Sequence, residues 1–405
     1  MPGPMEGVRV LEVATWGVAP IAATVLADWG ADVIKVEHPI TGDPVRGVFS
    51  RFRQGSDAGP VDVTWEHVNR GKRSIGVDVT TEAGRSIVHH LAAQADVFVT
   101  SFPTTKRQAF EIEIEDIRAV NPQIIYARAT TYGPRGEENE KAGHDHNAFW
   151  ARSGASHAAQ IAGASEYAPP IPVGAMGDYP TGLTLAGGIS AALFKRLRTG
   201  ETSVVDSSLF GVGVWAMAYS IITETEYARP ARPGHRNAMN PVSNTYRTSD
   251  GRFIYLALVQ SDRWWGDFCE HIERTDLRDD ERFVDFAARR ANSRALIEIL
   301  DEVFANRTYA EWRAQLRTLR GPWAPIQTAA ELHTDEQALA NDYLTKITAG
   351  NGSEVTVVGV PVQFDESAPA LTRAPEIGEH TELVLLESGM EWAEISAHKE
   401  SGVII

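Results

Sequence analysis

The chain has 405 residues, of which 43% are hydrophobic and 23% charged, and its net charge is −16. This length allows two domains with sizeable cores, and the acidic balance argues against nucleic acid or an anionic membrane surface as a partner. Cys269 is the only cysteine, the first residues lack a basic segment followed by an apolar run, and no apolar run approaches the roughly 20 residues of a membrane span, so we expect a cytoplasmic protein without disulfides.

Strand and helix patterns alternate through the first half of the chain. Helices joining successive strands predict parallel strands in a twisted sheet covered by helices. We therefore expect a doubly wound α/β domain. The turn at residues 14–20 has no Gly-x-Gly-x-x-Gly pattern, which argues against NAD or FAD binding. Strands are predicted at 8–13, 31–37, 75–79, 96–100, 124–130 and 203–206, and helices at 20–29, 82–93, 107–120, 183–197 and 209–223.

A change in composition at residues 228–234, rich in proline and arginine, predicts a linker. After it, two strand patterns at 244–247 and 253–258 flank a turn and indicate a hairpin. Helices are predicted at about 262–272, 292–305 and 308–319, and a strand at 355–362 returns to the first domain. The predicted organisation is a large domain at 1–227, a smaller α+β domain at 228–330, and a return to the large domain at 331–405.

The segment from Lys141 to Gly182 concentrates candidate chemistry. Asp178 lies between Gly177 and a Pro-Thr-Gly turn, just before the predicted helix at 183–197. Glycine before the acid allows a positive φ or the close approach of a ligand. The helix N-terminus favours a negative charge and therefore the ionised carboxylate. From its position alone, Asp178 is either a nucleophile or base, or a residue that only caps the helix.

Two histidines flank an aspartate at His144, Asp145 and His146. Alternate residues of a strand share a face, so the two imidazoles could converge. No further ligand stands nearby at a familiar metal spacing, so we predict no metal site. His144 either transfers protons and donates hydrogen bonds, or has a structural role.

The basic turn at residues 69–74 contains Lys72 and Arg73. It shares Gly-Lys with a P-loop but not the upstream glycine or the spacing of the hydroxyl residue. These two residues either contact a phosphate group or form a solvated turn.

Several stretches match a known pattern in order and spacing. They are residues 26–39 with Gly42, Asp43 and Arg46, then 69–78, 95–102, 177–208, 246–251 and 373–380. Together they resemble the class III CoA-transferase family, also called CaiB/BaiF, which includes formyl-CoA transferase and α-methylacyl-CoA racemase. The resemblance covers nearly the whole chain, from about residue 6 to residue 387.

The resemblance implies a Rossmann-like large domain built from both chain ends, a smaller α+β domain, and an interlocked homodimer. It also implies that an acyl-CoA and a carboxylic acid bind as substrates, with no permanently bound cofactor. Residues 15–19 would follow the pantetheine arm of CoA, and basic residues would neutralise its phosphates. The CoA contacts implied in this way are Thr15, Trp16, Gly17, Val18, Ala19, His38, Arg46, Lys72, Arg73, Arg107 and Lys141.

The family contains two chemistries. In the transferases, the residue that corresponds to Asp178 attacks a thioester and carries the acyl group and then CoA. In the racemases, Asp178 and His144 would exchange the α-proton of a 2-methylacyl-CoA. Gln260 stands where the racemases have a glutamate, and an amide cannot hold a proton as a carboxylate does. The expected function is therefore CoA transfer, with racemisation or non-catalytic acyl-CoA binding as alternatives, and the catalytic candidates are Asp178, His144 and Gln260.

Overall fold

The computed structural model describes residues 3–47, 61–160, 170–172, 174–227 and 234–405. The chain forms two compact units. The first comprises residues 1–157, 171–222 and 336–405, so it contains both chain ends, and the second comprises 158–170 and 223–335. Most of the predicted linker lies outside the described residues.

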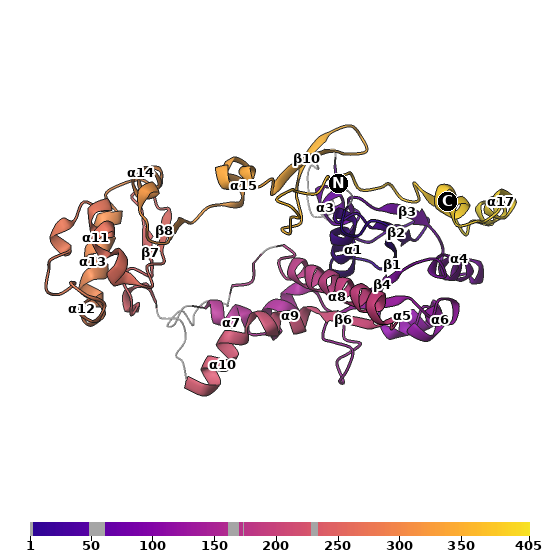
Figure 1. The fold of residues 1–405 in the computed structure, drawn as a ribbon, viewed down its shortest axis with the longest axis horizontal. Helices are drawn as coiled ribbons and strands as arrows, with labels where there is room; N and C mark the ends of the chain where they lie inside the picture. The colour runs from indigo at the N-terminus through magenta and orange to yellow at the C-terminus, as the bar shows by residue number, and fades with distance from the viewer. Residues whose placement is uncertain (1–2, 48–60, 161–169, 173, 228–233) are drawn as a thin grey trace. The chain divides into compact units, whose positions relative to one another are not determined.

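A six-stranded sheet is the centre of the first unit (Figure 1), with the order β3-β2-β1-β4-β5-β6. All five neighbouring pairs are parallel, so the carboxyl ends of all strands lie along one edge. The order reverses direction between β1 and β4. Strands occur at all six predicted places, namely β1 (Arg9–Val13), β2 (Asp32–Glu37), β3 (Arg73–Gly76), β4 (Val97–Thr100), β5 (Ile125–Thr130) and β6 (Val204–Ser208). The bounds predicted for β3 are wrong, because it begins two residues and ends three residues earlier than predicted.

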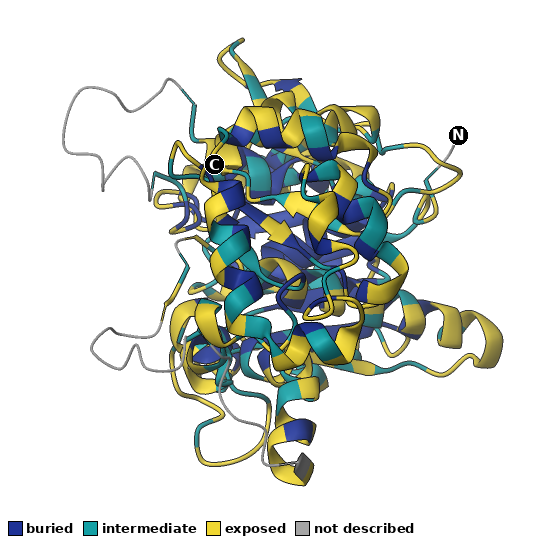
Figure 2. Cartoon of the chain, turned by 90° about the vertical axis from the view of Figure 1, so that its left-hand side faces the viewer, coloured by how far each residue is buried: buried dark blue, intermediate teal, exposed yellow. Residues whose placement is uncertain are grey.

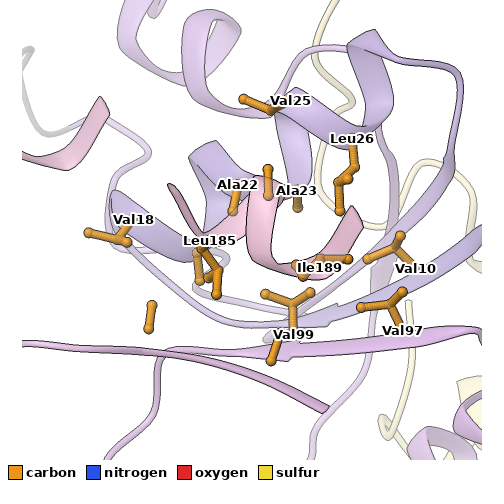
Figure 3. Packing of buried hydrophobic residues seen from close by; sticks show 14 of the residues in the cluster. Val10, Val18, Ala22, Ala23, Val25, Leu26, Val97, Val99, Leu185 and Ile189 are labelled. Atoms are coloured by element: carbon orange, nitrogen blue, oxygen red, sulfur yellow. The ribbon is translucent and has the colours of Figure 1, made fainter. Parts of the chain in front are cut away.

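Helices cover both faces of this sheet because alternate residues of each strand point to opposite sides. On one face, α1 (Val18–Asp28) and α8 (Asp178–Thr199) pack on Val10, Val97 and Val99. Figure 3 shows Leu185 and Ile189 of α8 between α1 and these strands. On the other face, strand residues pack on α4 (Glu82–Ala92), α6 (Ile114–Val120), α16 (Thr381–Glu387) and α17 (Trp392–Glu400). Figure 2 shows buried residues gathered in the strands and on the helix sides that face them.

Several predicted boundaries in the first unit are wrong. The helix predicted at 107–120 is two helices, α5 (Thr104–Ala109) and α6, because Glu111 has a φ of 54° and Glu113 caps the second. The helix predicted at 209–223 is divided at Met217 into α9 (Leu209–Ala216) and α10 (Ala218–Tyr227). The strand predicted at 355–362 becomes β11 (Glu354–Val358), which pairs with β10 (Leu344–Thr348) in a separate hairpin rather than with the large sheet. The other elements of this unit are α3 (Val63–Asn69), the π-helix η1 (His146–Arg152) and α15 (Glu336–Ala340). α7 (Ala155–Ala159) has residues in both units.

The second unit is a three-stranded antiparallel sheet with helices. The predicted hairpin is confirmed as β7 (Thr245–Arg247) and β8 (Phe253–Leu256), and β9 (Trp323–Pro325) adds the third strand. The ring of Phe304 lies 5.1 Å from that of Tyr246 and 4.7 Å from that of Trp312, at the centre of this core. Its longer helices are α11 (Ser261–His271), α12 (Phe286–Ala291), α13 (Ser293–Phe304) and α14 (Tyr309–Gln315). Throughout the described parts of the chain, no helix combines the length and apolar character needed to cross a membrane.

Candidate active site

A buried network of charges fixes the end of β1 and the turn that follows it. Both oxygens of Glu12 are paired, one with Lys35 Nζ and one with Lys72 Nζ, each at 2.7 Å. Lys35 also contacts Asp43 at 2.8 Å and donates to the backbone oxygen of Ala14 at 3.1 Å. Burial alone would raise the pKa of Glu12, but the two ammonium groups outweigh it and hold that pKa below its usual value.

The turn at Trp16 and Gly17 has an uncommon backbone. Trp16 has a φ of 70°, a left-handed conformation that is unusual for a bulky residue. Its amide donates to Asp43 Oδ1 at 3.2 Å, so the charge network helps to hold this conformation. A Cβ atom on Gly17 would lie only 2.5 Å from Asp178 Oδ2. The glycine is therefore required by the close approach of the Asp178 carboxylate to the turn.

Asp178 is the first residue of α8, which begins five residues earlier than predicted. Gly177 occupies the N-cap position with a φ of −79°, so the positive φ considered for it is wrong. This glycine instead allows close packing, because a Cβ there would lie 2.6 Å from Phe149 Cγ. Asp178 is the first helical residue and Gly177 occupies the N-cap position, so Asp178 is not the N-cap of this helix.

The environment of Asp178 disfavours its charge. Partial burial is the main cause that raises its pKa to about 7, and the carboxylate of Asp145 adds to the rise, while His146 opposes it. The expectation that the helix N-terminus would favour the ionised form is therefore wrong in its net direction. Asp145 is buried and accepts a hydrogen bond from the Gly177 amide at 3.2 Å, so it is fixed next to the start of α8. Asp178 is a carboxyl group that titrates near neutral pH.

A cavity of about 580 Å³ lies over the carboxyl edge of the sheet and includes Asp178 in its lining. His144 is exposed in the same cavity, and its ring meets that of Trp16 edge to face at 5.6 Å. The residues predicted from the sequence that line this cavity are Thr15, Trp16, Gly17, Val18, Arg107, Lys141, His144 and Asp178.

Five implied CoA contacts do not line this cavity, namely Ala19, His38, Arg46, Lys72 and Arg73. Ala19 is fully buried in α1, and His38 accepts hydrogen bonds from the amides of its own turn. Lys72 is buried against Glu12, Arg46 pairs with Glu37 at 2.8 Å, and Arg73 pairs with Asp32 and Glu387, each at 2.6 Å. These three cations have carboxylate partners and do not line the cavity, so the phosphate site that we propose below does not include them.

The remaining predictions concern the histidines at 144 and 146 and the catalytic candidate Gln260. The shared strand face expected for His144 and His146 is wrong, because a π-helix begins at His146. Among the described residues, no group of His, Cys, Asp or Glu is arranged to hold a metal ion. Gln260 lies in the second unit at the N-terminus of α11, and its catalytic role stays a prediction.

The cavity also contains residues that sequence reasoning missed. Lys106 lines it from α5, is exposed, and forms no ion pair within the described parts of the chain. Its ammonium group lies 5.5 Å from the centre of the Phe102 ring. The sequence feature that could have identified Lys106 is its position next to Arg107, which gives two adjacent cations after β4. Arg128 and Tyr179 also line the cavity.

A carboxylate in a cavity at the carboxyl edge of a parallel sheet is the arrangement of an α/β enzyme. The family model described as CoA-transferase family III matches residues 5–381, and the chain belongs to this family.

Two relatives and one solved structure show the extent of the similarity. A (R)-2-hydroxy-4-methylpentanoate CoA-transferase from Clostridioides difficile is 34% identical over 403 residues, 99% of each chain. A succinate–glutarate CoA-transferase from Agrobacterium fabrum is 30% identical over 387 residues, 95% of each chain. The crystal structure of a CaiB/BaiF family protein from Brucella suis has a TM-score of 0.80 at 30% identity, and the match covers 96% of this chain and 100% of that one.

Proposed function

We propose that this protein transfers CoA from an acyl-CoA to a carboxylic acid, with Asp178 as a covalent nucleophile. The observation that carries the proposal is the placement of Asp178. Its carboxylate lies in the cavity against Gly17, and among the described residues no lysine or arginine pairs with it. A carboxylate without a cation partner keeps its lone pairs available for attack.

The reaction proceeds by successive exchanges at the Asp178 carboxyl group. Its carboxylate attacks the acyl-CoA thioester, the CoA thiolate leaves, and an acyl-aspartyl anhydride forms. The thiolate then attacks the aspartyl carbonyl, which gives an aspartyl-CoA thioester and releases the first acid. The acceptor carboxylate attacks this thioester to form a second anhydride, and the thiolate takes its acyl group, which restores the Asp178 carboxylate. Covalent catalysis thereby divides one difficult exchange into easier steps.

CoA is a substrate in this proposal, and no resident cofactor takes part. We place the pantetheine arm along Thr15, Trp16 and Gly17, which line the cavity next to Asp178. Lys106, Arg107 and Lys141 line the same cavity and supply positive charge for the phosphates of CoA. Arg107 is also paired with Glu113 at 3.1 Å and Lys141 with Glu138 at 2.7 Å, so Lys106 is the one of the three without a carboxylate partner among the described residues. An acidic chain needs such a local basic site to bind a polyanion.

We also propose an interlocked homodimer with a Rossmann-like large domain. The strand order is that of doubly wound nucleotide-binding sheets. Large apolar side chains are exposed on α9 and α10, including Trp215 at 80% and Ile222 at 59%, and clusters of this kind mark interaction surfaces. The domain limits at 1–227, 228–330 and 331–405 and the cytoplasmic location remain part of this proposal.

The proposed function can be tested by measuring the transfer of CoA from one acid to another. The protein is incubated with unlabelled acyl-CoA donors and isotopically labelled acids, and labelled acyl-CoA is measured by mass spectrometry. We expect labelled acyl-CoA to form only in the presence of enzyme and donor.

Racemisation is the second candidate function, and the position of His144 in the lining of the same cavity favours it. Deuterium uptake from D₂O at the α-carbon without label exchange would support the racemase, and binding without either signal would support a non-catalytic protein.

A further inference from the structure

The cavity has two chemically different ends, which the strand order places on opposite sides of β1. Gly17, which follows β1, and Asp178 lie between them. On the side of β4 and β5, the lining residues Lys106 and Arg107 come from α5 after β4, and Lys141 follows β5. On the side of β2 and β3, Val45 follows β2 and α3 precedes β3. The cations are therefore gathered at one end only.

The other end forms an apolar compartment, which we define as Val18, Ile21, Val45, Thr64, Val68 and Tyr179. Val18 and Ile21 are three residues apart on α1, and Thr64 and Val68 are four apart on α3, so each pair shares one helix face. Ile21, Val45 and Val68 belong to the same buried cluster. The Tyr179 ring lies 5.2 Å from that of His67 on α3, which joins the start of α8 to the same wall.

The cations close to the apolar compartment are held by internal partners. Arg46, next to Val45, pairs with Glu37 and lies over the Trp65 ring at 3.4 Å. Arg70 pairs with Asp28 at 2.6 Å, and Lys72 is buried against Glu12 at 2.7 Å. Within the described part of the chain, no lysine or arginine lines the compartment. A second carboxylate placed there would lose its water without gaining a charged partner from the described residues.

We propose that the acids exchanged by this protein carry an apolar side chain, branched or aromatic, and no second carboxylate. This inference rests on the proposed CoA transfer and names its substrate class. With CoA at the basic end and the thioester at Asp178, the acyl side chain lies in the apolar compartment. Burial of methyl groups or of an aromatic ring there is favourable. Donor and acceptor acids use the same position in turn, so both belong to this class.

A binding experiment tests the substrate class apart from catalysis. S-isohexyl-CoA and S-carboxybutyl-CoA are thioethers that cannot transfer their alkyl group. The first ends in an isopropyl group after three methylenes, and the second ends in a carboxylate after four. We expect the isohexyl compound to bind the full-length protein at least ~10-fold more tightly in calorimetry. Equal or tighter binding of the carboxybutyl compound would overturn the inference, whether or not CoA transfer is observed. Tighter isohexyl binding with no CoA exchange from any donor would support the compartment and contradict the transferase function.

A pair of variants in α3 sharpens the test. Thr64→Arg introduces a cation into the compartment, and the backbone amide of Thr64 keeps its bond to Asp62. Val63→Arg adds the same charge at the neighbouring position, which is 56% exposed and does not line the cavity. We expect Thr64→Arg to shift relative binding toward the carboxybutyl compound by at least ~10-fold and Val63→Arg to leave the ratio unchanged. Melting temperatures establish that both variants fold, and an equal shift in the two would contradict the compartment.

Discussion

Glu12 and Asp178 are carboxylates at the same edge of the sheet, but their surroundings are opposite. Glu12 is fully buried between Lys35 and Lys72, and its pKa lies below the usual value. Asp178 is only partly buried, has Asp145 rather than a cation beside it, and has a pKa raised to about 7. Lys72 of the basic turn thus stabilises the fold at the end of β1, and the carboxylate that faces the cavity is left reactive.

The largest effect that this contrast predicts is on activity. Asp178→Asn keeps the shape but removes the charge and the nucleophile, so we expect CoA transfer to fall by at least ~10³-fold. The variant should fold, and at pH 8 it should melt at the wild-type temperature or higher, because the repulsion from Asp145 is lost. The rate of CoA transfer and the melting temperature are measured for the wild type and the variant. An active Asp178→Asn variant would contradict the assignment of Asp178 as the nucleophile.

A large effect on stability is expected at the other carboxylate. Lys72→Met leaves Glu12 Oε2 without its partner and removes the donor to Asn69 Oδ1, so the free energy of unfolding should fall by roughly 3 kcal/mol. Lys106→Met is the matched control, because Lys106 is exposed and its replacement should change stability by less than about 0.5 kcal/mol. Urea denaturation of both variants measures the difference. Equal stabilities would show that the buried network does not support the fold.

A smaller effect is expected in CoA binding. Lys106→Ala should weaken binding of free CoA by about 10-fold at low salt and reduce its salt dependence, because an exposed cation of the cavity is lost. Arg73→Ala should leave CoA affinity unchanged, since Arg73 is paired with Asp32 and Glu387 and does not line the cavity. Calorimetry at two salt concentrations measures the CoA affinity of both variants. A larger loss of affinity in Arg73→Ala than in Lys106→Ala would indicate that the basic turn is the phosphate site.

The smallest predicted change is a shift in the pH profile. Attack requires ionised Asp178, so kcat/KM should rise with pH up to about 7 and then level off. Asp145→Asn removes the like charge that raises the pKa of Asp178, so the acidic limb should move to lower pH. His146→Gln should move it to higher pH, because His146 lowers that pKa. If the acidic limbs of the pH profiles coincide in the wild type, Asp145→Asn and His146→Gln, these electrostatic effects on the pKa of Asp178 are excluded.

The sequence predicted the alternating elements well because each buried strand and amphipathic helix has a local pattern. It failed where a single residue sets a boundary, as with the left-handed Glu111 between α5 and α6. It located Asp178, His144 and the turn at Thr15 to Val18 in one cavity through the family resemblance.

Charge partners were beyond reach of the sequence. Lys72 and Lys106 each precede an arginine, so their sequence neighbours do not distinguish them. Lys72 differs because it pairs with Glu12, which is 60 residues away in sequence. The raised pKa of Asp178 likewise depends first on its burial and then on Asp145, which the fold brings to the start of α8. Such effects require the folded arrangement of groups distant in the chain.

The most direct test of the central claim is to trap the covalent intermediate. The wild-type protein is mixed with an acyl-CoA, treated with hydroxylamine or borohydride, digested, and examined by mass spectrometry. The account predicts a modification on the peptide that contains Asp178, dependent on acyl-CoA and absent from Asp178→Asn. Wild-type protein that transfers CoA at full rate without any such modification, or that carries it on another residue, would contradict the account.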